Sequence, residues 1–273
     1  MQRDQASRRD RLNESGGLTV AFATTAAERE ACYRLRYRVF VEEMGATIPP
    51  GHGGQERDAF DPHCHHLMVR DTSGAVVACT RVLTDTQACL TGGFYSEQEF
   101  DLAGIRKLPG RVMEIGRTCV HPDWRRGGTI AALWAGLARF MADNRFGYLI
   151  GCASIPMGDG GETARAITHS LLSRHLAPAE RRVRPRRPLP ALGGQAGKSS
   201  SRLPPLLKAY MRLGATVGGE PCWDPAFGCA DLFILLESAD LQSRYLRHFV
   251  DRRRAPEPMP TRATRATRAH IAA

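Results

Sequence analysis

The sequence predicts an α/β (α+β) fold, a single central sheet with helices packed on it. Short apolar runs recur along the chain, and several are separated only by turn residues, which is typical of hairpin-connected strands. Between them lie longer segments whose apolar residues recur at helical spacing. Hydrophobic residues make up 42% of the chain, enough to build the core that such a sheet needs.

The first predicted elements are a strand and a long helix. Residues 18–23 (LTVAFA) form an apolar run that predicts the strand. Thr25 precedes a helix that continues to about Met44 and is stopped by Gly45. The stretch 46–62 is rich in glycine and proline and is therefore a predicted loop.

The middle of the chain predicts a hairpin followed by a strand–helix–strand unit. The apolar runs 66–71 and 75–84 are separated by the turn TSG and predict the hairpin. Residues 112–120 are the next predicted strand, and residues 129–143 place six apolar side chains on one helical stripe. Residues 148–155 (YLIGCASI) predict the strand after that helix.

The last third alternates helices with one strand. Residues 162–175 are a predicted helix, and a basic, proline-rich crossing follows at 177–200. The segment 203–215 (LPPLLKAYMRLGA) begins with prolines suited to a first helical turn and ends near Gly214. Residues 231–237 predict a late strand, and residues 241–249 predict a short final helix.

Length and composition predict one main domain with additions. At 273 residues, a domain over residues 17–250 is expected, with a basic, proline-rich insertion at about 177–202. Residues 1–16 are a predicted flexible arm, and residues 251–273, with a repeated TRA unit, are a predicted disordered basic tail. The net charge of +10 favours an anionic partner: a nucleic acid, an acidic protein or an anionic membrane surface.

The ends of the chain and its cysteines predict a cytoplasmic protein. The N-terminus mixes charges of both signs and has no apolar core, so no signal peptide is expected. No apolar run approaches the roughly 20 residues that a membrane span needs. The eight cysteines are scattered and never form CxxC, which favours a reducing compartment without disulfides.

The junction between the strand 112–120 and the helix that follows it predicts an anion site. Unpaired N–H groups at a helix N-terminus, together with the helix dipole, favour a phosphate. Gly127 and Gly128 allow close approach of the backbone, and Arg125 or Arg126 adds guanidinium donors. The order of strand, Arg/Gly turn and amphipathic helix is more specific than the turn alone.

A second group of residues places charges where apolar side chains are expected. Arg36 lies on or beside the stripe of the first helix, so it needs a carboxylate partner unless it reaches solvent at the edge. The loop supplies Asp58 and Asp61, and Arg81 lies within an apolar strand. Glu114 and Arg117 are three apart, which puts them on opposite faces of a regular strand unless Gly116 marks a bulge. An internal salt-bridge network is the alternative explanation for these charges.

The strand–turn–helix order resembles the acyl-donor site of the GCN5-related N-acyltransferase (GNAT) superfamily. The resemblance implies a mixed, mostly antiparallel sheet, with a pantetheine arm lying between the strands 112–120 and 148–155. Arg126 departs from the pattern, since glycine or a neutral residue is common there; a carrier-protein arm, with its single phosphodiester, suits such a turn better than coenzyme A. The implied donor-binding residues are Thr118, Cys119, Val120, Arg125, Arg126, Gly127, Gly128 and Thr129.

The charged residues are similar to those of acyl-homoserine-lactone synthases, which share this fold: RxxxF at Arg36, DxxD at Asp58 and Asp61, Arg81, then ExxR at Glu114 and Arg117. Over residues 18–250 the chain more closely resembles the L-ornithine Nα-acyltransferases. That resemblance implies transfer of a (3-hydroxy)acyl group from acyl carrier protein to the α-amino group of L-ornithine. The product is lyso-ornithine lipid, the first intermediate of ornithine lipid synthesis.

The chemistry of that reaction and the charges of these residues suggest a role for each. Glu114 is the expected general base, with Arg117 beside it, and a strand N–H near residues 118–120 stabilises the oxyanion. Asp58 and Asp61 are candidates for the substrate's side-chain ammonium, and Arg36 or Arg81 for its carboxylate. No cofactor is expected to be bound permanently, since the carrier-protein phosphopantetheine, or acyl-coenzyme A, is the donor substrate.

Several alternatives remain at this stage. The chain is also compatible with an acyl-coenzyme A-dependent N-acyltransferase, or a lactone-type synthase, acting on another amine. No basic platform with interleaved aromatic residues, helix-turn-helix pattern or zinc spacing supports a nucleic-acid-binding protein. The run His63-Cys64-His65-His66 lacks a second ligand pair for a metal and predicts a strand entry with His66 packed inside. The basic residues 181–187 and the tail are candidates for steering acyl carrier protein or the anionic inner membrane face.

Overall fold

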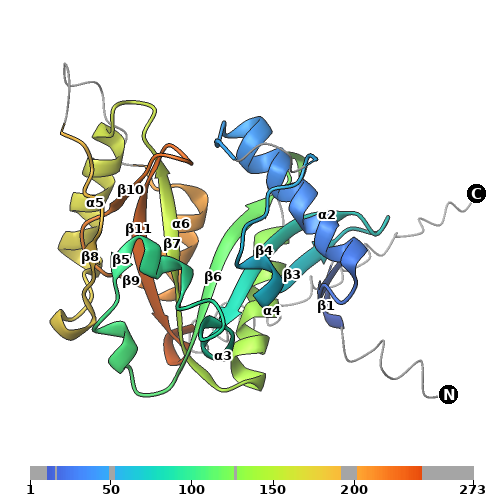
Figure 1. Ribbon diagram of the computed structural model, residues 1–273. Helices are drawn as coiled ribbons and strands as arrows, with labels where there is room; N and C mark the ends of the chain where they lie inside the picture. The colour runs from blue at the N-terminus through green and yellow to red at the C-terminus, as the bar shows by residue number, and fades with distance from the viewer. Residues whose placement is uncertain (1–10, 16, 49–52, 126–127, 192–201, 242–273) are drawn as a thin grey trace, which may run out of the picture.

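The structure, a computed structural model, describes residues 11–15, 17–48, 53–125, 128–191 and 202–241. One large mixed sheet runs through the molecule (Figure 1). Its strands are β1 (Arg11–Ser15), β2 (Leu18–Phe22), β3 (His65–Arg70), β4 (Val76–Thr84), β6 (Arg111–Val120), β7 (Phe146–Pro156), β9 (Thr216–Val217), β10 (Cys222–Asp224) and β11 (Cys229–Glu237). They follow the order β1-β2-β3-β4-β6-β7-β11-β10, and β9 pairs with β11. Separately, β5 (Phe100–Asp101) pairs with β8 (Arg184–Pro185).

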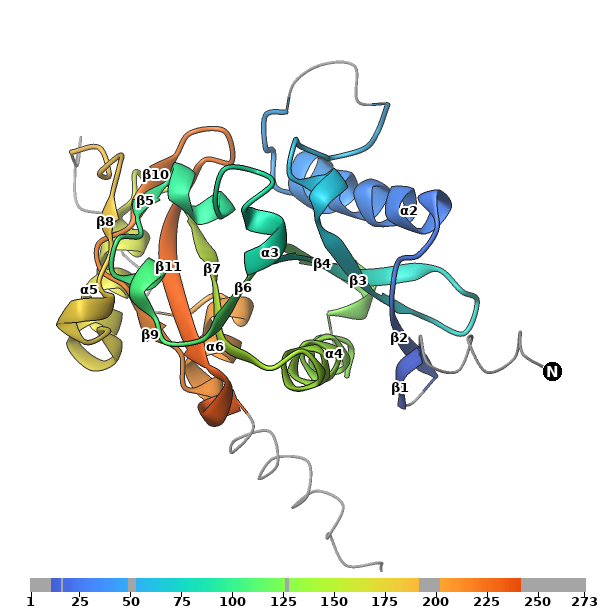
Figure 2. The ribbon, with the colours of Figure 1, turned by 60° about the horizontal axis from the view of Figure 1, so that its bottom comes forward.

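Helices cover both faces of this sheet (Figure 2). On one face lies α2 (Ala26–Arg36), near the segment that carries β5. The opposite face is covered by α4 (Thr129–Asp143) and α6 (Pro205–Leu213), while α5 (Glu162–His175) packs against β7 and β9. A short helix, α3 (Asp85–Ala88), follows β4. The result is a three-layer α/β arrangement, as predicted.

The main core lies between the sheet and the face that carries α4 and α6. Leu133 and Leu137 of α4 are 1% exposed and pack with apolar residues of the central strands. Trp134 of α4 and Tyr210 of α6 meet edge to face, with ring centroids 5.2 Å apart. A smaller cluster, which includes Cys32 and Leu35, joins α2 to the other face. The apolar stripe predicted for residues 129–143 is therefore buried.

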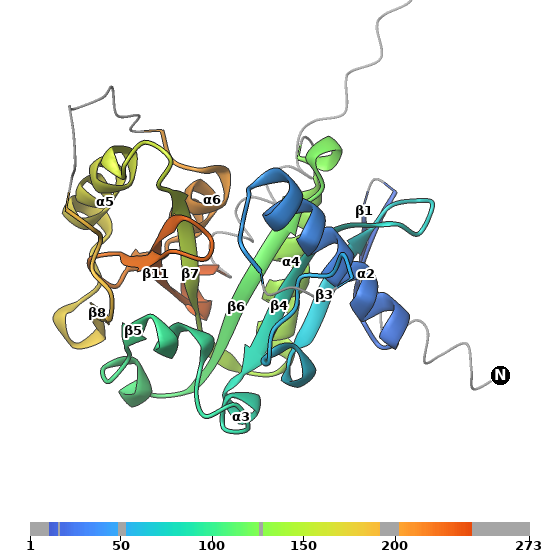
Figure 3. The ribbon, with the colours of Figure 1, turned by 45° about the horizontal axis from the view of Figure 1, so that its top comes forward.

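The strands β6 and β7 are parallel to each other and then separate. Their paired residues extend only from Arg111 to Glu114 on β6. Beyond Glu114, β6 pairs with β4, and β7 continues along β11. Gly151 lies at the point of separation, where an added Cβ would be 2.4 Å from the carbonyl oxygen of Ile115. Only glycine allows the strands to approach this closely, and a V-shaped opening follows (Figure 3).

Most predicted elements are confirmed, and the helices 129–143 and 162–175 have the predicted bounds. The long first helix is α2 followed by a π-helical segment, Tyr37–Glu43. The wider π-helical turn changes the phase of the stripe, so Met44 is 51% exposed instead of continuing the buried face. Gly45 and Gly214 have positive φ angles, as residues that end helices often do.

Other differences concern short elements at the edges of the fold. Within the segment 1–16, for which a flexible arm was predicted, residues Arg11–Ser15 form β1, which pairs with β2. Strands of two or three residues, such as β5, β8 and β9, were not predicted because so few residues show no periodicity. The basic insertion includes β8. The predicted final helix, apart from its first residue, and the basic tail lie outside the described residues.

Candidate active site

A cavity of about 500 Å³ occupies the opening between β6 and β7. The opening joins the two faces of the sheet, and its two sides differ in character. Apolar residues from the α4 and α6 face line one side, among them Ile130, Leu206 and Tyr210. Charged and polar residues line the other side, among them Glu114 and Arg117. The site can therefore hold a molecule with a long apolar part and a polar reacting end.

A bulge in β6 brings Glu114 and Arg117 to the same side. The pairing of β4 with β6 shifts between Cys79 and Arg81, and Arg117 adopts a φ of 54°. Such an angle is uncommon for a residue with a side chain and indicates a local constraint. The predicted bulge next to Gly116 is confirmed. Without it, strict alternation would direct Arg117 into the apolar core on the α4 face.

Six charged residues form a closed ring in which arginines and carboxylates alternate. Glu56 bridges Arg36 (Nε–Oε2 2.5 Å) and Arg117 (Nε–Oε1 3.0 Å). Asp58 bridges Arg117 (Nη2–Oδ2 3.1 Å) and Arg81 (Nη1–Oδ1 2.5 Å). Asp61 closes the ring between Arg81 (Nη1–Oδ1 3.4 Å) and Arg36 (Nη1–Oδ1 2.6 Å). We call this set the charge ring; its three positive and three negative charges compensate one another.

The charge ring extends from the protein interior to the cavity. Arg36 and Asp61 are 1% and 2% exposed and do not line the cavity, whereas Arg81 and Arg117 do. Arg36 is thus buried and paired, and the alternative of an arginine at the solvent edge is wrong. Asp61 accepts two hydrogen bonds from Arg36. Burial alone would raise the pKa of Asp61, but the Arg36 guanidinium keeps it below its usual range. Asp58 is engaged by two arginines and caps the turn at Phe60.

Aromatic rings hold Arg117 at the cavity. Its guanidinium lies 4.8 Å from the ring centroid of Tyr95 and 4.7 Å from that of Phe227. Cation–π contacts of this kind strengthen when the cation is desolvated. Arg117 is therefore fixed by two carboxylates and two rings, and its position is set before any ligand binds.

Glu114 is buried at the cavity wall and anchors a neighbouring turn. Its carboxylate accepts hydrogen bonds from the N–H groups of Tyr95 (2.6 Å) and Ser96 (2.8 Å) and from the Ser96 hydroxyl. These N–H groups begin the 3-10 helix Tyr95–Gln98, where they have no partner within the helix. Burial raises the pKa of Glu114 despite these hydrogen bonds. A carboxyl group with a raised pKa is suited to exchanging protons near neutral pH.

Three further carboxylates, which we call the acidic group, line the same side of the cavity: Glu99, Asp224 and Asp231. Glu99 is 8% exposed and Asp231 is 4% exposed. Burial, together with the negative charge of Asp231, raises the pKa of Glu99. Burial also raises the pKa of Asp231. The sequence analysis did not identify this group.

The residues predicted to bind the acyl donor are brought together only in part. Thr118, Cys119, Val120 and Arg125 line the cavity. Gly128 immediately precedes α4, whose first residue, Thr129, is 2% exposed and not part of the lining. Arg126 and Gly127 lie outside the described residues. Arg125 pairs with Glu43 through two contacts of 2.6 Å, but both side chains are largely exposed, so an anion can compete for the guanidinium.

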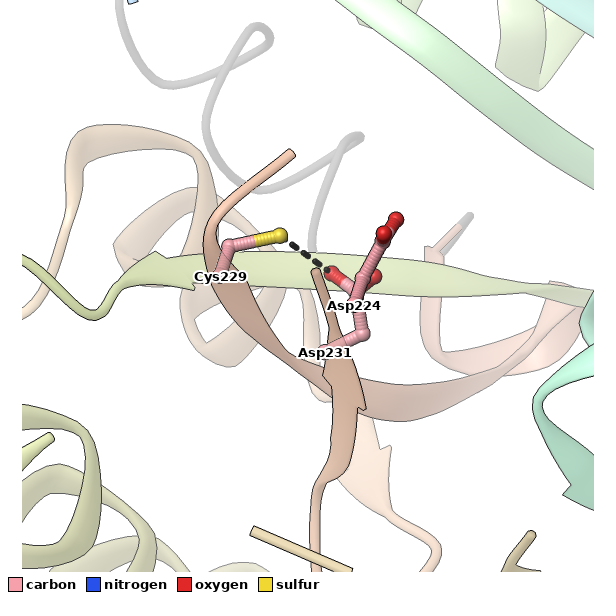
Figure 4. Close-up of side chains that lie close together, drawn as sticks. All are labelled: Asp224, Cys229 and Asp231. Atoms are coloured by element: carbon pink, nitrogen blue, oxygen red, sulfur yellow. Dashed lines mark hydrogen bonds between the residues drawn. The ribbon is translucent and has the colours of Figure 1, made fainter. Parts of the chain in front are cut away.

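A metal site can be tested on one cluster of the described residues. Asp224, Cys229 and Asp231 each offer a donor atom within 4.8 Å of the others. Figure 4 shows the Cys229 thiol directed at the Asp231 carboxylate, with Asp224 beside them. Burial raises the pKa of the Cys229 thiol. His66 is buried and hydrogen-bonded to Tyr33, which confirms the prediction that it packs inside.

Two of the missed features carried some signal in the sequence. Three arginines inside apolar elements require three carboxylate partners, and the sequence analysis named only Asp58 and Asp61. Glu56, two residues before Asp58, was the nearest remaining carboxylate that could serve as the third partner. Asp231 begins the apolar run DLFILLE, an unusual place for a carboxylate. Glu99 carried no such signal, because it lies in an irregular segment that only the fold brings to the cavity.

Comparisons with known proteins agree with this arrangement. Residues 35–135 match the family model described as acetyltransferase (GNAT) domain. The L-ornithine N(alpha)-acyltransferase of Rhizobium meliloti is 36% identical over 88% of this chain and 86% of its own length. That of Agrobacterium fabrum is 35% identical over 86% of this chain and 85% of its own length. Among solved structures, the chain is similar to FeeM, an N-acyl amino acid synthase from uncultured soil microbes. The alignment covers 85% of this chain and 97% of FeeM, with a TM-score of 0.50 and 12% sequence identity. This likeness supports the fold.

The separated parallel strands, the cavity between them and the matching family model define an N-acyltransferase of the GNAT type. Within that class, the chain belongs to the L-ornithine N(alpha)-acyltransferase family. Within the part of the chain that the structure describes, no helix has the length and apolar character to cross a bilayer.

Proposed function

We propose that the protein transfers a (3-hydroxy)acyl group from acyl carrier protein to the α-amino group of L-ornithine, giving lyso-ornithine lipid. The observation that carries the proposal is the two-sided cavity in the opening between β6 and β7. The thioester lies in the opening, the acyl chain extends along the apolar side, and the amine approaches from the polar side. Relatives that span most of this chain are named for the same acceptor.

The donor is assigned to the end of the cavity near α4. Arg125 lines this end, and the N-terminus of α4 is directed toward the same turn. A helix N-terminus together with a guanidinium favours a phosphate group. Beyond Glu114, β6 has no strand partner on the β7 side, so its outward N–H groups remain available to a thioester oxyanion.

Glu114 is the proposed general base. The attacking amine must be neutral, so its proton has to leave as the new N–C bond forms. Oε2 of Glu114 accepts one backbone hydrogen bond and retains one lone pair. The amine attacks the thioester carbon, Glu114 takes the amine proton, and the C–S bond breaks. The thiolate leaves with a proton returned by Glu114, so the products are an amide and a free thiol.

The charge ring is proposed to support this chemistry. Arg81 and Arg117 present their guanidinium groups to the cavity and are the candidates for the acceptor's carboxylate. Arg36 and Asp61 act behind them, because neither lines the cavity. Asp58 fixes Arg81 and Arg117 at the same time. This replaces the expectation that Asp58 and Asp61 hold the ammonium, since neither carboxylate lines the cavity.

The membrane is the proposed destination of the product. An acylated amino acid partitions into a bilayer, and the net charge of +10 attracts both an acidic carrier protein and an anionic inner membrane face. We therefore place the enzyme in the cytoplasm, at that face. Co-sedimentation with anionic but not neutral vesicles is the measurement that tests this location.

The reaction is tested with purified protein, L-ornithine and 3-hydroxyacyl carrier protein, with the product identified by mass spectrometry. An amide of ornithine is expected, with acyl-coenzyme A a poorer donor at equal concentration. Equal or better use of acyl-coenzyme A would contradict the carrier-protein assignment. The Glu114→Gln variant should lose about 100-fold or more in kcat, because a positioned base contributes about 10²–10⁴-fold. Wild-type turnover in a folded Glu114→Gln protein would rule out the base role.

A further inference from the structure

The acidic group contains a buried carboxylate oxygen without a hydrogen-bond partner. Glu99 is 8% exposed, and its Oε2 has no partner among the described residues. Glu99 lines the cavity, while its Oε2 itself has almost no exposed surface. A buried acceptor that stays unpaired is destabilised, so a donor that enters the cavity and reaches this oxygen relieves the penalty.

The charges around Glu99 are not compensated by the protein. Within the described part of the chain, no ion pair involves Glu99, Asp224 or Asp231. The neighbouring charge ring, in contrast, has equal numbers of arginines and carboxylates. Asp224 accepts only from backbone N–H groups of its own turn, at Ala226 and Phe227. The cavity therefore has one side where arginines and carboxylates pair and one side whose carboxyl groups have no ion-pair partner among the described residues.

The acidic group lies beside the proposed reaction centre. Ser96 donates its hydroxyl to Glu114 and contacts the Cys152 thiol at 3.3 Å, so Glu114 and the β7 wall are adjacent. Ser154, two residues further along β7, is the partner of Asp231 in the sheet. Residues two apart on a strand share a face, so Cys152 and Ser154 point to the same side of β7. Cys152 lies next to Ser96, the partner of Glu114, and Ser154 lies opposite Asp231. Asp231 is therefore on the same side of the opening as Glu114.

We propose that Glu99, Asp231 and Asp224 form the acceptor pocket that binds the side-chain ammonium of a dibasic amino acid and selects it over neutral amino acids. The assignment rests on the proposed function, since it names the part of the site that recognises ornithine. In this arrangement Arg81 and Arg117 bind the acceptor's carboxylate, the α-amine faces Glu114, and the side chain extends to the acidic group. Recognition of both ends fixes which of the two amines attacks.

An organic ammonium fits the acidic group better than a metal ion does. The cluster of described residues there offers three donor atoms, one fewer than a structural zinc site takes. An ammonium needs only hydrogen-bond acceptors and one or two negative charges, which Glu99 and Asp231 supply. The raised pKa of Glu99 agrees with this interpretation, because a bound cation favours the ionised carboxylate.

The test compares L-ornithine with L-norvaline, which has the same carbon skeleton without the side-chain amine. Removing one charged hydrogen-bond partner costs about 1.5–3 kcal/mol, or roughly 10–150-fold in kcat/KM. Glu99→Gln and Asp231→Asn should each lower kcat/KM for ornithine by about this factor, mainly through KM. Their kcat/KM for norvaline should stay within about threefold of wild type or increase. Glu97→Gln is the matched control, because this carboxylate lies on the same segment but pairs with Arg106 and does not line the cavity.

Three outcomes would contradict the proposed ammonium pocket. Equal losses for both acceptors in Glu99→Gln would mean that Glu99 acts on the reacting amine. An unchanged ornithine/norvaline ratio in both folded variants would remove the group from recognition. Loss of activity on chelation, restored by zinc alone, would replace the ammonium with a metal. If wild type acylates neither ornithine nor norvaline but acylates another amine, the proposed function fails instead.

Discussion

Replacing Glu56 by glutamine tests whether the charge ring holds the site together. Glu56 is 2% exposed and bridges Arg36 and Arg117 at 2.5 and 3.0 Å. Glutamine has nearly the same shape, so the substitution removes one negative charge without opening a cavity. Three arginines then share two aspartates in the interior. The amide nitrogen of glutamine would also point its hydrogens at one guanidinium. Both groups are hydrogen-bond donors, so no hydrogen bond forms between them.

The expected loss of stability follows from this geometry. Two ion pairs at about 4 Å between charge centres are each worth about 4 kcal/mol at an effective dielectric constant of about 20. Part of this lost interaction energy is recovered, because the arginines still interact with Asp58, Asp61 and the carbonyl oxygen of the glutamine. Breaking a buried pair by removing one partner costs about 3–5 kcal/mol, and we expect about 3 kcal/mol for Glu56→Gln. A domain with a stability of about 5–15 kcal/mol stays folded after that loss.

Urea denaturation followed by tryptophan fluorescence measures the change, with Trp134 as a buried reporter. Glu30→Gln is the matched control, because Glu30 pairs with Arg34 on the surface, where the side chains are 49% and 55% exposed. That variant should lie within about 0.5 kcal/mol of wild type. If Glu56→Gln is also within about 0.5 kcal/mol, the charge ring does not stabilise the fold and the reasoning is refuted.

Three further outcomes follow from the same structure. Gly151→Ala should lower the free energy of unfolding by about 1–3 kcal/mol, because its Cβ would meet the Ile115 carbonyl; an unchanged urea midpoint contradicts this. Arg125→Gln should raise the donor KM roughly tenfold and leave stability unchanged, and an unaltered KM removes Arg125 from donor binding. Burial raises the pKa of Glu99, so this carboxyl stays protonated to a higher pH than a free glutamate, and ornithine binding must expel the proton. The ornithine/norvaline ratio of kcat/KM should therefore rise as the pH rises through the titration of Glu99 and stay flat in Glu99→Gln. Asp231, Asp224, Arg117 and Cys152 also face this group.

The sequence predicted the central elements because their patterns are long and unambiguous. The α4 stripe extends over 15 residues, and the end of α6 at Gly214 follows from a residue that tolerates a positive φ. Five of the six members of the charge ring were also found, since a charge within an apolar run needs a partner wherever the chain folds. What the pattern did not reveal was the pairing. Asp58 and Asp61 were expected to bind a ligand, whereas the structure commits both to arginines.

The sequence by itself determined that this chain forms a sheet with packed helices and buried charges, because periodicity and the cost of burying a charge are local properties. Only the tertiary structure decided which arginine pairs with which carboxylate, and which carboxylates have no arginine partner. The bulge at Arg117 reverses the direction of one side chain, and the irregular segment around Tyr95 brings Glu99 to β11, more than a hundred residues later in the chain. Neither effect has a period in the sequence, since both depend on contacts between residues that are distant along the chain.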